Sequence, residues 1–396
     1  MAPQMTAQQR QMQALQNNMD ARNLIVAKAV KMTQNIFSTT FNPQSLLQFN
    51  VPFRNVGLVL GFWVDLAVSA ADPTSTNVYS LTALGPANLV KQFIVTDLNN
   101  NTRIQTTGWH VHFVNTAKKG APFCVARTNT SYPIAYGVNW TTAFAAQATI
   151  TNGNFATGTT YMRYWVPLAY SDFDLRGAIY MNVVNATAYL QINLTPGTEA
   201  YVATGSDPVG AVYIATTGAP TSNYGTTATI NVYQVYYDQL PVAQNGAPVL
   251  PLVDLSTNYE LKNTTYVGVA TGQDFPMAYS NFRDFLSTFA IWDVSGTLDV
   301  GAFTTAWKLQ SANFTNIFNV SANLAAIWGR NAIQDDFPAG VYYFDSRNKP
   351  ISTVQYGNME LVLTPTGSLG ATPKVLVGYE DFSMQNTIVG AASLQT

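Results

Sequence analysis

Two histidines, His110 and His112, are the residues best suited to bind a metal ion. They are the only histidines in the 396-residue chain, and they are two positions apart in a segment that we expect to be a strand. Both side chains would then project from one face. A site built on this pair also needs a carboxylate and a further histidine. Phe113–Ala126 contains no Asp or Glu. We therefore predict no metal and no other cofactor, and histidines that hydrogen-bond at a subunit or domain contact.

Other side chains with catalytic potential are equally isolated. Cys124 is close to His112 in sequence, but it follows Pro122-Phe123 among apolar residues and is predicted to lie in the core. Pairs of carboxylates occur, such as Asp172 with Asp174 and Asp335 with Asp336. Such pairs can hydrolyse glycosides, but these are expected at strand corners, where Asp commonly caps turns. The chain has no Gly-x-Ser-x-Gly elbow and no basic stripe with interleaved aromatics. We predict neither an enzyme nor a sequence-specific nucleic-acid-binding protein.

The composition indicates a surface that other chains cover. Only 10% of the residues are charged, whereas 47% are hydrophobic, with 21 Tyr and 21 Phe. Typical soluble domains have about 25% charged residues. A protein flanked by copies of itself fits this composition, and so does a Thr/Asn-rich extracellular β-protein. The single cysteine excludes an intrachain disulfide and favours synthesis in a reducing cytosol. No apolar run reaches the roughly 18 residues that span a bilayer.

The first 34 residues differ from the rest of the chain. Methionines and other apolar residues recur at heptad-like spacing, which predicts an amphipathic helix. Four cations oppose the single acid Asp20, so this arm carries +3, while the remaining 15 basic and 20 acidic residues give −5. The asymmetry favours an arm that meets an anionic surface. The alternative is a helix packed against its own body with solvated cations.

After Asn42-Pro43 the periodicity changes from helical to extended. Runs rich in β-branched and aromatic residues predict strands within 56–70, 89–98, 103–117, 159–170, 186–194 and 227–240. The Pro/Gly-rich segment 240–251 breaks this pattern and predicts a domain boundary. One helix is expected within 320–336 of the second domain, where apolar residues keep helical spacing.

The two domains share a pattern. Tyr189–Gly197 reads YLQINLTPG, and Met359–Gly367 reads MELVLTPTG. Each follows an aromatic strand with an acidic corner and precedes an aromatic strand that ends in acid. This order predicts an internal duplication, with chance similarity between strands as the alternative.

Several longer segments together resemble one known family. Thr106–Phe123 reads TTGWHVHFVNTAKKGAPF, and further matches begin at Gly85 (GPANLV), Tyr164 (YWVPLAYSDFDLRGA), Asp238 (DQLPVAQNG), Leu250 (LPLVDLST), Asp335 (DDFPAGVYYFDSRNKPISTVQYGN) and Gly378 (GYEDF). They resemble the major capsid protein of tectiviruses, which are tailless bacteriophages with a membrane inside an icosahedral shell. The matches span nearly the whole chain and weaken within 195–229 and 295–331.

The resemblance implies an all-β fold of two side-by-side eight-stranded jelly rolls with an N-terminal amphipathic helix and a few short helices. The expected divisions are 1–42 for an arm on the inner side of the capsid, 43–245 for the first roll and 246–396 for the second. Three such chains would form a trimer of near-hexagonal outline in the virion shell. The implied partners are copies of this chain, vertex and minor capsid proteins, and the internal membrane. The residues expected to face that membrane are Arg10, Met12, Leu15, Met19, Arg22, Lys28 and Lys31.

One rival function comes from another class of protein. The Tyr and Phe residues could furnish sugar platforms in a bacterial carbohydrate-binding or cupin-type jelly-roll protein. Such a protein would be a monomeric binder, whereas the capsid protein would be a stable trimer.

Overall fold

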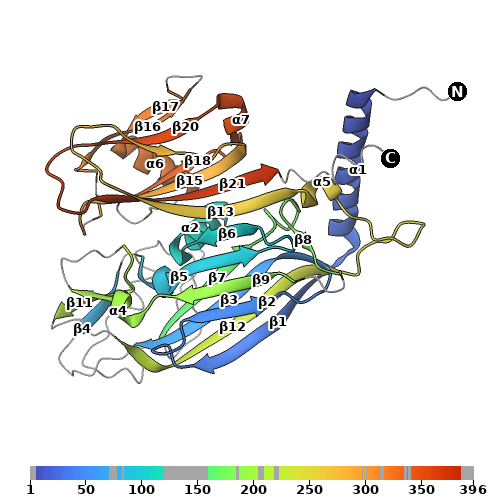
Figure 1. Cartoon of the computed structure of the whole chain (residues 1–396), viewed down its shortest axis with the longest axis horizontal. Coiled ribbons are helices and arrows are strands. Elements are labelled where there is room, and N and C mark those ends of the chain that lie inside the picture. The colour runs from blue at the N-terminus through green and yellow to red at the C-terminus, as the bar shows by residue number, and fades with distance from the viewer. Residues whose placement is uncertain are drawn as a thin grey trace.

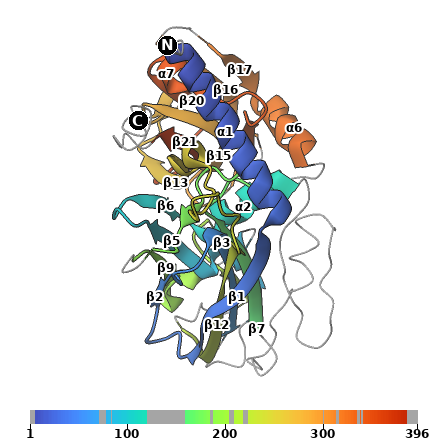
Figure 2. The same ribbon diagram turned by 90° about the vertical axis from the view of Figure 1, so that its right-hand side faces the viewer.

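The structure is a computed structural model of the whole chain (Figures 1 and 2). It describes residues 6–70, 78–82, 84–119, 159–183, 187–203, 209–217, 223–296, 298–299, 301–312, 316–333, 337 and 340–384. Strands dominate these residues. They form two rolls, one above the other in Figure 1, and helix α1 (Ala7–Lys28) stands at one end of the molecule.

The first roll consists of two four-stranded sheets. One sheet has the order β1 (Val30–Phe41), β12 (Tyr224–Asp238), β3 (Leu58–Ala70) and β7 (Thr159–Pro167), and the short β8 (Ile179–Tyr180) pairs with β3. The other has the order β2 (Gln48–Pro52), β9 (Tyr189–Leu194), β5 (Val90–Thr96) and β6 (Thr102–Thr106). Every second residue of β9 is buried, because successive side chains of a strand point to opposite faces of the sheet.

The second roll repeats this arrangement. One sheet has the order β13 (Thr257–Val267), β21 (Lys374–Met384), β15 (Arg283–Asp293) and β18 (Val341–Asp345), with β19 (Ile351–Ser352) beside β15. The other has the order β14 (Phe275–Ala278), β20 (Met359–Pro365), β16 (Thr304–Ser311) and β17 (Phe318–Ser321). Taken in chain order, the eight strands of each roll occupy the same places in the two sheets. This confirms the predicted fold of two jelly rolls.

The shared sequence pattern coincides with this repeat. The segment YLQINL is β9, which pairs with β2 and β5, and the segment MELVLTP is β20, which pairs with β14 and β16. The two segments therefore occupy equivalent strands. The aromatic strands that follow them, β12 and β21, are also equivalent.

The two rolls are joined through their sheets. Strand β6 of the first roll pairs in parallel with β13 of the second, where Ile104 is opposite Leu261 and Gln105 is opposite Lys262. The pairing connects one sheet of each roll into a single sheet of nine strands, β19 included. The largest apolar core continues across this junction, because Phe289, Tyr343 and Phe382 of the second roll belong to the same cluster as the core of the first. A separate cluster fills the second roll, and a third lies beneath α1.

Short elements complete the fold. Strands β4 (Val78–Leu81), β10 (Tyr201–Ala203) and β11 (Tyr213–Thr217) form a small sheet at the end opposite α1 (Figure 1). Helix α2 (Gly108–Lys119) lies between β6 and β7 in the chain, and α6 (Ala322–Ile333) lies between β17 and β18. The remaining elements are η1 (Gly85–Leu89), α4 (Gly197–Ala200), α5 (Leu252–Leu255) and α7 (Thr353–Tyr356). The predicted boundary coincides with an exposed hairpin after β12, in which Val242 bridges Pro248.

Three predictions of local structure need comment. The helix within 320–336 is confirmed as α6. The expectation that helical structure lasts to residue 42 is wrong, because 30–41 form β1, where several β-branched residues favour the strand. The strand predicted at 103–117 ends at Thr106, and α2 follows. Cys124, Asp335 and Asp336 lie outside the described residues.

Candidate assembly surfaces

The predicted histidine pair lies in a helix and at the junction between the rolls. Because two residues on a helix are about 200° apart, His110 and His112 do not share one face as predicted for a strand. The His110 ring packs against β21 of the second roll, where Gly378 leaves room for it: an ideal Cβ at this glycine would stand 2.6 Å from His110 Nε2. The helix therefore serves as a contact between the rolls.

The histidines do not form a metal centre with other described residues. His110 Nδ1 is 2.6 Å from the hydroxyl of Thr106, and both rings are buried. Burial lowers the pKa of each histidine from 6.5 to about 3, so both are neutral at physiological pH. Among the described residues, no group of three His, Cys, Asp or Glu side chains could hold a metal ion. A contact between a histidine and a hydroxyl group in an apolar setting is typical of a packed interface.

A buried ion pair also crosses this junction. Lys118, near the end of α2, lies 3.0 Å from a carboxylate oxygen of Glu380 on β21 and donates a hydrogen bond to the Tyr259 hydroxyl on β13. Its ammonium group also lies over the rings of Tyr170 and Tyr259. Glu380 accepts further hydrogen bonds from Tyr259 and Ser287. Nothing in the sequence analysis indicated that Lys118 joins the rolls.

A second group of buried charges lies at the end of β21 nearest to α1. Glu260 and Asp381 are cross-strand neighbours, and Nη1 of Arg283 lies 2.6 Å from the first carboxylate and 2.7 Å from the second. Like charges directly opposite one another in a sheet repel. Burial raises the pKa of Asp381 to about 7, against the lowering effect of Arg283. The arginine thus holds two carboxylates together at one end of the second roll.

Helix α1 begins with strong local signals. Thr6 caps the helix: its hydroxyl accepts a hydrogen bond from the Gln9 backbone N–H, and the Gln9 side chain accepts one from the Thr6 N–H. The helix ends where Ala29 turns to the extended conformation that starts β1. No helix in the described part of the chain is long and apolar enough to cross a membrane.

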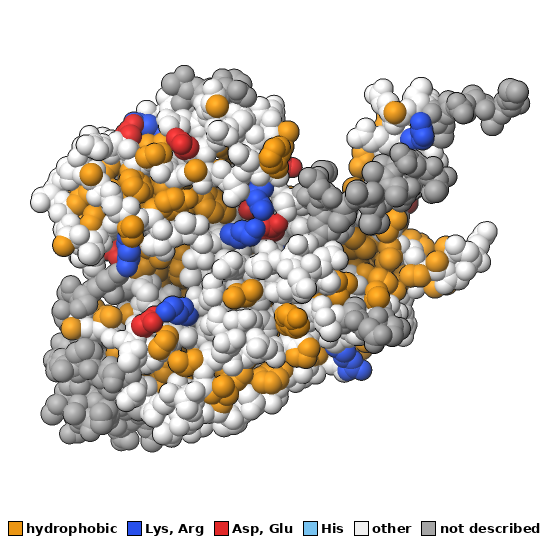
Figure 3. All heavy atoms as spheres, in the orientation of Figure 1, with side chains coloured by type: hydrophobic (Ala, Val, Ile, Leu, Met, Phe, Trp, Pro, Cys, Tyr) orange, Lys and Arg blue, Asp and Glu red, His pale blue; other side chains and the backbone are white. Residues whose placement is uncertain are grey.

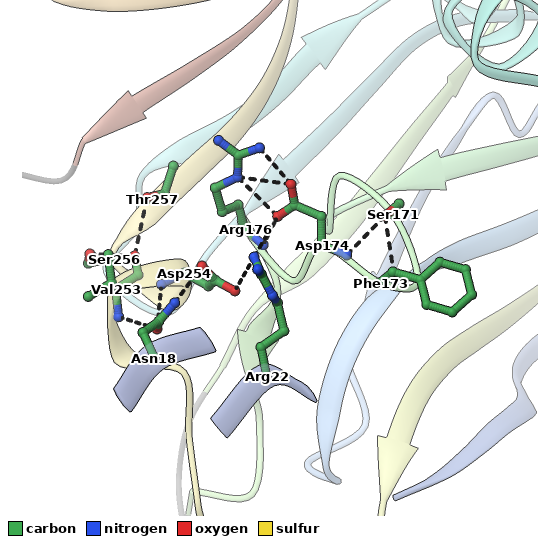
Figure 4. A network of polar contacts seen from close by, with 10 residues as sticks. All are labelled: Asn18, Arg22, Ser171, Phe173, Asp174, Arg176, Val253, Asp254, Ser256 and Thr257. Carbon is green, nitrogen blue, oxygen red and sulfur yellow. Dashed lines mark hydrogen bonds and ion pairs between the residues drawn. The ribbon is translucent and has the colours of Figure 1, made fainter. Parts of the chain in front are cut away.

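The second half of α1 is fixed to the body by a polar network (Figure 4). Asn18 donates to a carboxylate oxygen of Asp254 at 2.9 Å, and its own side-chain oxygen accepts from the backbone N–H groups of Val253 and Asp254. One turn later, Arg22 lies 3.5 Å from Asp254 and 3.9 Å from Asp174. Asn18 and Arg22 thus bind α1 to α5 and to the loop after β7.

Apolar packing continues this attachment. Ile25 is fully buried with residues of β3, β12 and the loop after β7. The residues of α1 that face the body, Asn18, Ala21, Arg22 and Ile25, follow helical spacing. This face was missed because it contains only two apolar residues. The sequence signal for this face was the pair Ala21 and Ile25, which are four residues apart and therefore lie on the same face of a helix.

The residues predicted to face a membrane separate into two groups. Arg10, Met12, Leu15, Met19 and Lys28 are exposed on α1. Arg22 instead belongs to the network with Asp254, and Lys31 lies on β1, where its ammonium group is 2.6 Å from Asp172. The prediction that Lys31 is on the helix is therefore wrong, and Arg22 already has acidic partners within its own chain.

The face of the molecule drawn in Figure 3 has few charges. Figure 3 shows isolated Lys, Arg, Asp and Glu side chains among uncharged and apolar ones, with apolar side chains near the base of α1. Several of the cations are next to acids, as in the pair Lys91–Glu199. Such a surface is typical of proteins that are packed against other chains.

Two jelly rolls fused side by side, with few charges on the surface, define a protein of the double jelly-roll class. The family model described as P3 major capsid protein N-terminal matches residues 1–240, and the one described as P3 major capsid protein C-terminal matches residues 256–396. The chain belongs to this family of major capsid proteins. The resemblance seen in the sequence is thereby confirmed.

Individual proteins agree with this assignment. The chain is 38% identical over 396 residues to the major capsid protein P3 of Enterobacteria phage PRD1, covering 100% of this chain and 98% of that protein. Its fold is similar to the crystal structure of the STIV major capsid protein, with a TM-score of 0.60 and 12% identity over 90% of this chain and 97% of that one. A chain from the atomic structure of Sulfolobus Turreted Icosahedral Virus gives a TM-score of 0.62, with 14% identity over 92% of this chain and 95% of that one. The protein is a structural component of the virion capsid.

Proposed function

We propose that three copies of this chain form a trimer of near-hexagonal outline, and that such trimers tile an icosahedral shell. The observation that carries this proposal is the repeat of the roll within one chain. Two equivalent rolls in each copy supply six similar units around a threefold axis, and hexagonal tiles pack without gaps. Neighbouring trimers and vertex or minor capsid proteins are the further partners of such a tile.

The trimer is tested by measuring the mass of the purified parent protein by light scattering and imaging it in negative stain. We expect the mass of three 43.1 kDa chains and a pseudo-hexagonal outline. Obligate contacts of this kind bury about 2,000 Å² or more. A monomer that persists at micromolar concentration and neutral pH would contradict the proposal.

The exposed face of α1 is proposed to contact a membrane beneath the shell. Of the predicted cations, Arg10 and Lys28 form no ion pair with the residues that the structure describes, and Asp20 opposes them. At about 1 kcal/mol per cation, charge alone binds weakly. The exposed Met12, Leu15 and Met19 add more, because full burial of such a side chain contributes about 1.5–3 kcal/mol. Many arms on one closed shell would act together.

The membrane proposal is tested with the trimer and anionic lipid vesicles in a flotation assay. The triple variant Met12→Ser, Leu15→Ser, Met19→Ser should float less than the parent protein. A control with three exposed polar positions of the same helix changed, Gln11→Ser, Gln13→Ser and Asn17→Ser, should float like the parent. Equal flotation of the parent and the triple variant would show that this surface does not contact the membrane.

We also infer that the chain catalyses no reaction and binds no specific nucleic-acid sequence. The histidines are buried and neutral at the junction, and Asp172 and Asp174 are next to Lys31 and Arg176. Each candidate catalytic group in the described residues thus has a structural partner. Hydrolysis of a glycoside panel by the purified protein, abolished by Asp174→Asn, would overturn this inference.

A further inference from the structure

Large apolar side chains that protrude into solvent gather at one end of the molecule, where α1 lies. Among the described residues, seven such side chains are 60% or more exposed, and six of the seven lie at this end. The six are Met12, Phe173, Val242, Leu252, Phe282 and Val354, while Val267 lies at the opposite end of the rolls. Single exposed apolar side chains are ordinary, but their concentration at one end indicates a partner for that end.

The strand registers fix these positions. Val30 follows α1 and is opposite Asp238 at the end of β12, so the hairpin after β12 lies at the α1 end. Strand β7 also ends there, because Pro167 is opposite Gly61, near the start of β3. In the second roll, the turn before β15 and helix α7 lie at this end as well (Figure 1). Loops of both rolls therefore present apolar side chains in the direction of α1.

Three of these side chains lie around the base of α1, and we call Phe173, Val242 and Leu252 the foot residues. Phe173 precedes Asp174, and Leu252 begins α5, so both belong to segments that bind α1 through the network of Figure 4. Val242 lies in the hairpin that extends past the base of α1 in Figure 1. The exposed apolar side chains of this end are therefore not confined to the helix.

Each foot residue is held on a hydrogen-bonded turn. The backbone N–H groups of Phe173 and Asp174 donate to Ser171 Oγ, and the Phe173 ring points away from the polar network in Figure 4. Val242 bridges Pro248 across the hairpin. Fixed turns lower the conformational entropy that a contact costs, so these side chains are suited to meet a partner.

The connection that carries two of the foot residues is uncharged. The sequence contains no charged residue between Asp238 and Asp254, and most of this segment is exposed. Moving the segment into apolar surroundings therefore desolvates no ionised group.

A lipid surface fits the foot residues better than a second copy of the chain. Tiles that pack side by side contact one another through their flanks, whereas the foot residues lie at an end of the rolls. The foot residues also lie on three separate turns. A fluid bilayer accepts single apolar side chains at any spacing, whereas a protein partner must match their arrangement.

We propose that Phe173, Val242 and Leu252 insert into the membrane that α1 contacts, so that the first roll and its connection to the second rest directly on the lipid. The inference rests on the proposed membrane contact of α1 and extends that site to the body of the protein. Because this part of the contact is apolar, salt should weaken it little, whereas salt screens the attraction between the exposed cations of α1 and an anionic surface.

The first experiment measures how the full-length protein partitions at high salt into vesicles of phosphatidylethanolamine and phosphatidylglycerol. The foot variant Phe173→Ser, Val242→Ser, Leu252→Ser should have a partition coefficient at least about tenfold below that of the parent, because full burial of one such side chain contributes that much. The control Leu46→Ser, Val267→Ser changes exposed apolar residues at the opposite end and should partition like the parent.

The outcomes separate this inference from the proposed function. A foot variant that partitions like the parent would overturn this inference alone, because the triple variant of α1 still tests the membrane contact of the helix. A foot variant that loses the mass of the parent in light scattering would assign the foot residues to a subunit contact and would also overturn the inference. A parent protein that binds no vesicles would instead overturn the proposed membrane contact as a whole.

The second experiment detects insertion directly and changes only one exposed position at a time. In a Cys124→Ser background, Phe173→Cys and Val267→Cys place an environment-sensitive fluorophore at positions whose native side chains are 73% and 71% exposed. On addition of the same vesicles, the emission of the label at 173 should shift to shorter wavelength and be quenched by lipids with a spin label in the acyl chain. The label at 267 should keep its spectrum. An unchanged spectrum at 173, with the protein bound to the vesicles, would overturn the inference.

Discussion

His110 of the first roll lies directly against Gly378 of the second, and no side chain at 378 could leave this contact unchanged. Three atoms of the imidazole ring lie within 2.7 Å of the position where a Cβ would be. A glycine inside a strand often marks such a close approach. The position of α2 on β21 is therefore set by the His110 ring and by the absence of a side chain at Gly378.

The variant Gly378→Ala should destabilise the protein by about 1–3 kcal/mol, since the added methyl group must displace the imidazole or the strand. Gly210→Ala is the control, because nothing lies within 4 Å of an ideal Cβ there. Denaturant unfolding of both variants measures the difference. Equal stability of Gly378→Ala and the parent would show that the rolls are not held at this distance.

The buried histidines should make the protein sensitive to acid. Their pKa of about 3 in the folded protein is below the ordinary 6.5, so between these values the unfolded chain binds more protons. Each histidine then costs about 1.4 kcal/mol of stability per pH unit as the pH falls from 6.5 towards 3. The double variant His110→Gln, His112→Gln should lose less stability than the parent between pH 7 and pH 4. Parallel curves of unfolding free energy against pH for the two proteins would contradict this. We also expect the metal content of both proteins to be near zero.

Arg283→Met should be strongly destabilising. It leaves Glu260 and Asp381 opposite one another without their shared cation, and breaking a buried pair in this way costs about 3–5 kcal/mol. The loss should be smaller at pH 5 than at pH 8, because Asp381, whose pKa is about 7, is protonated at the lower pH. Lys91→Met, which breaks the exposed pair with Glu199, should cost less than about 1 kcal/mol. Similar losses of stability in the two variants would show that burial does not strengthen the ion pairs of Arg283.

Truncation should separate the two halves of α1. Deleting residues 1–17 removes only the part before Asn18, and stability should stay close to that of the parent. Deleting residues 1–34 also removes Ile25 and the first five residues of β1. Loss of a buried isoleucine alone costs about 2–5 kcal/mol. Thermal unfolding of the two truncated proteins checks this, and equal melting temperatures would refute the structural role of residues 18–34.

Much of the fold follows from local sequence patterns. The alternation in Tyr189–Leu194 marks a strand, because every second residue is buried. The aromatic run before Asp238 marks another strand by its β-favouring residues, although residues 234–237 are all buried. The LTP segments marked equivalent strands of the two rolls. These features depend on neighbours in the sequence, so the sequence alone is sufficient to recognise them.

The junction between the rolls could not be predicted in this way. Residues 108–119 are rich in residues that favour strands, yet they form α2, because both faces of the helix are covered, one by each roll. Burial on two sides removes the polar face by which an amphipathic helix is recognised. Likewise, the attachment of α1 uses Asn18 and Arg22, whose acidic partners lie more than 150 residues away in sequence. Such pairings depend on the tertiary structure.

The nine-stranded sheet has a consequence for synthesis of the chain on the ribosome. Strand β6 and helix α2 emerge well before β13, so the first roll presents an incomplete edge and an apolar helix until the second roll is translated. The outer face of β15 and β21, with Phe289 and Phe382, needs that same edge and helix as its cover. A fragment beginning at residue 256 would therefore expose this face and aggregate when expressed alone. Co-expression of the two fragments should restore solubility, because each half provides the missing surface of the other.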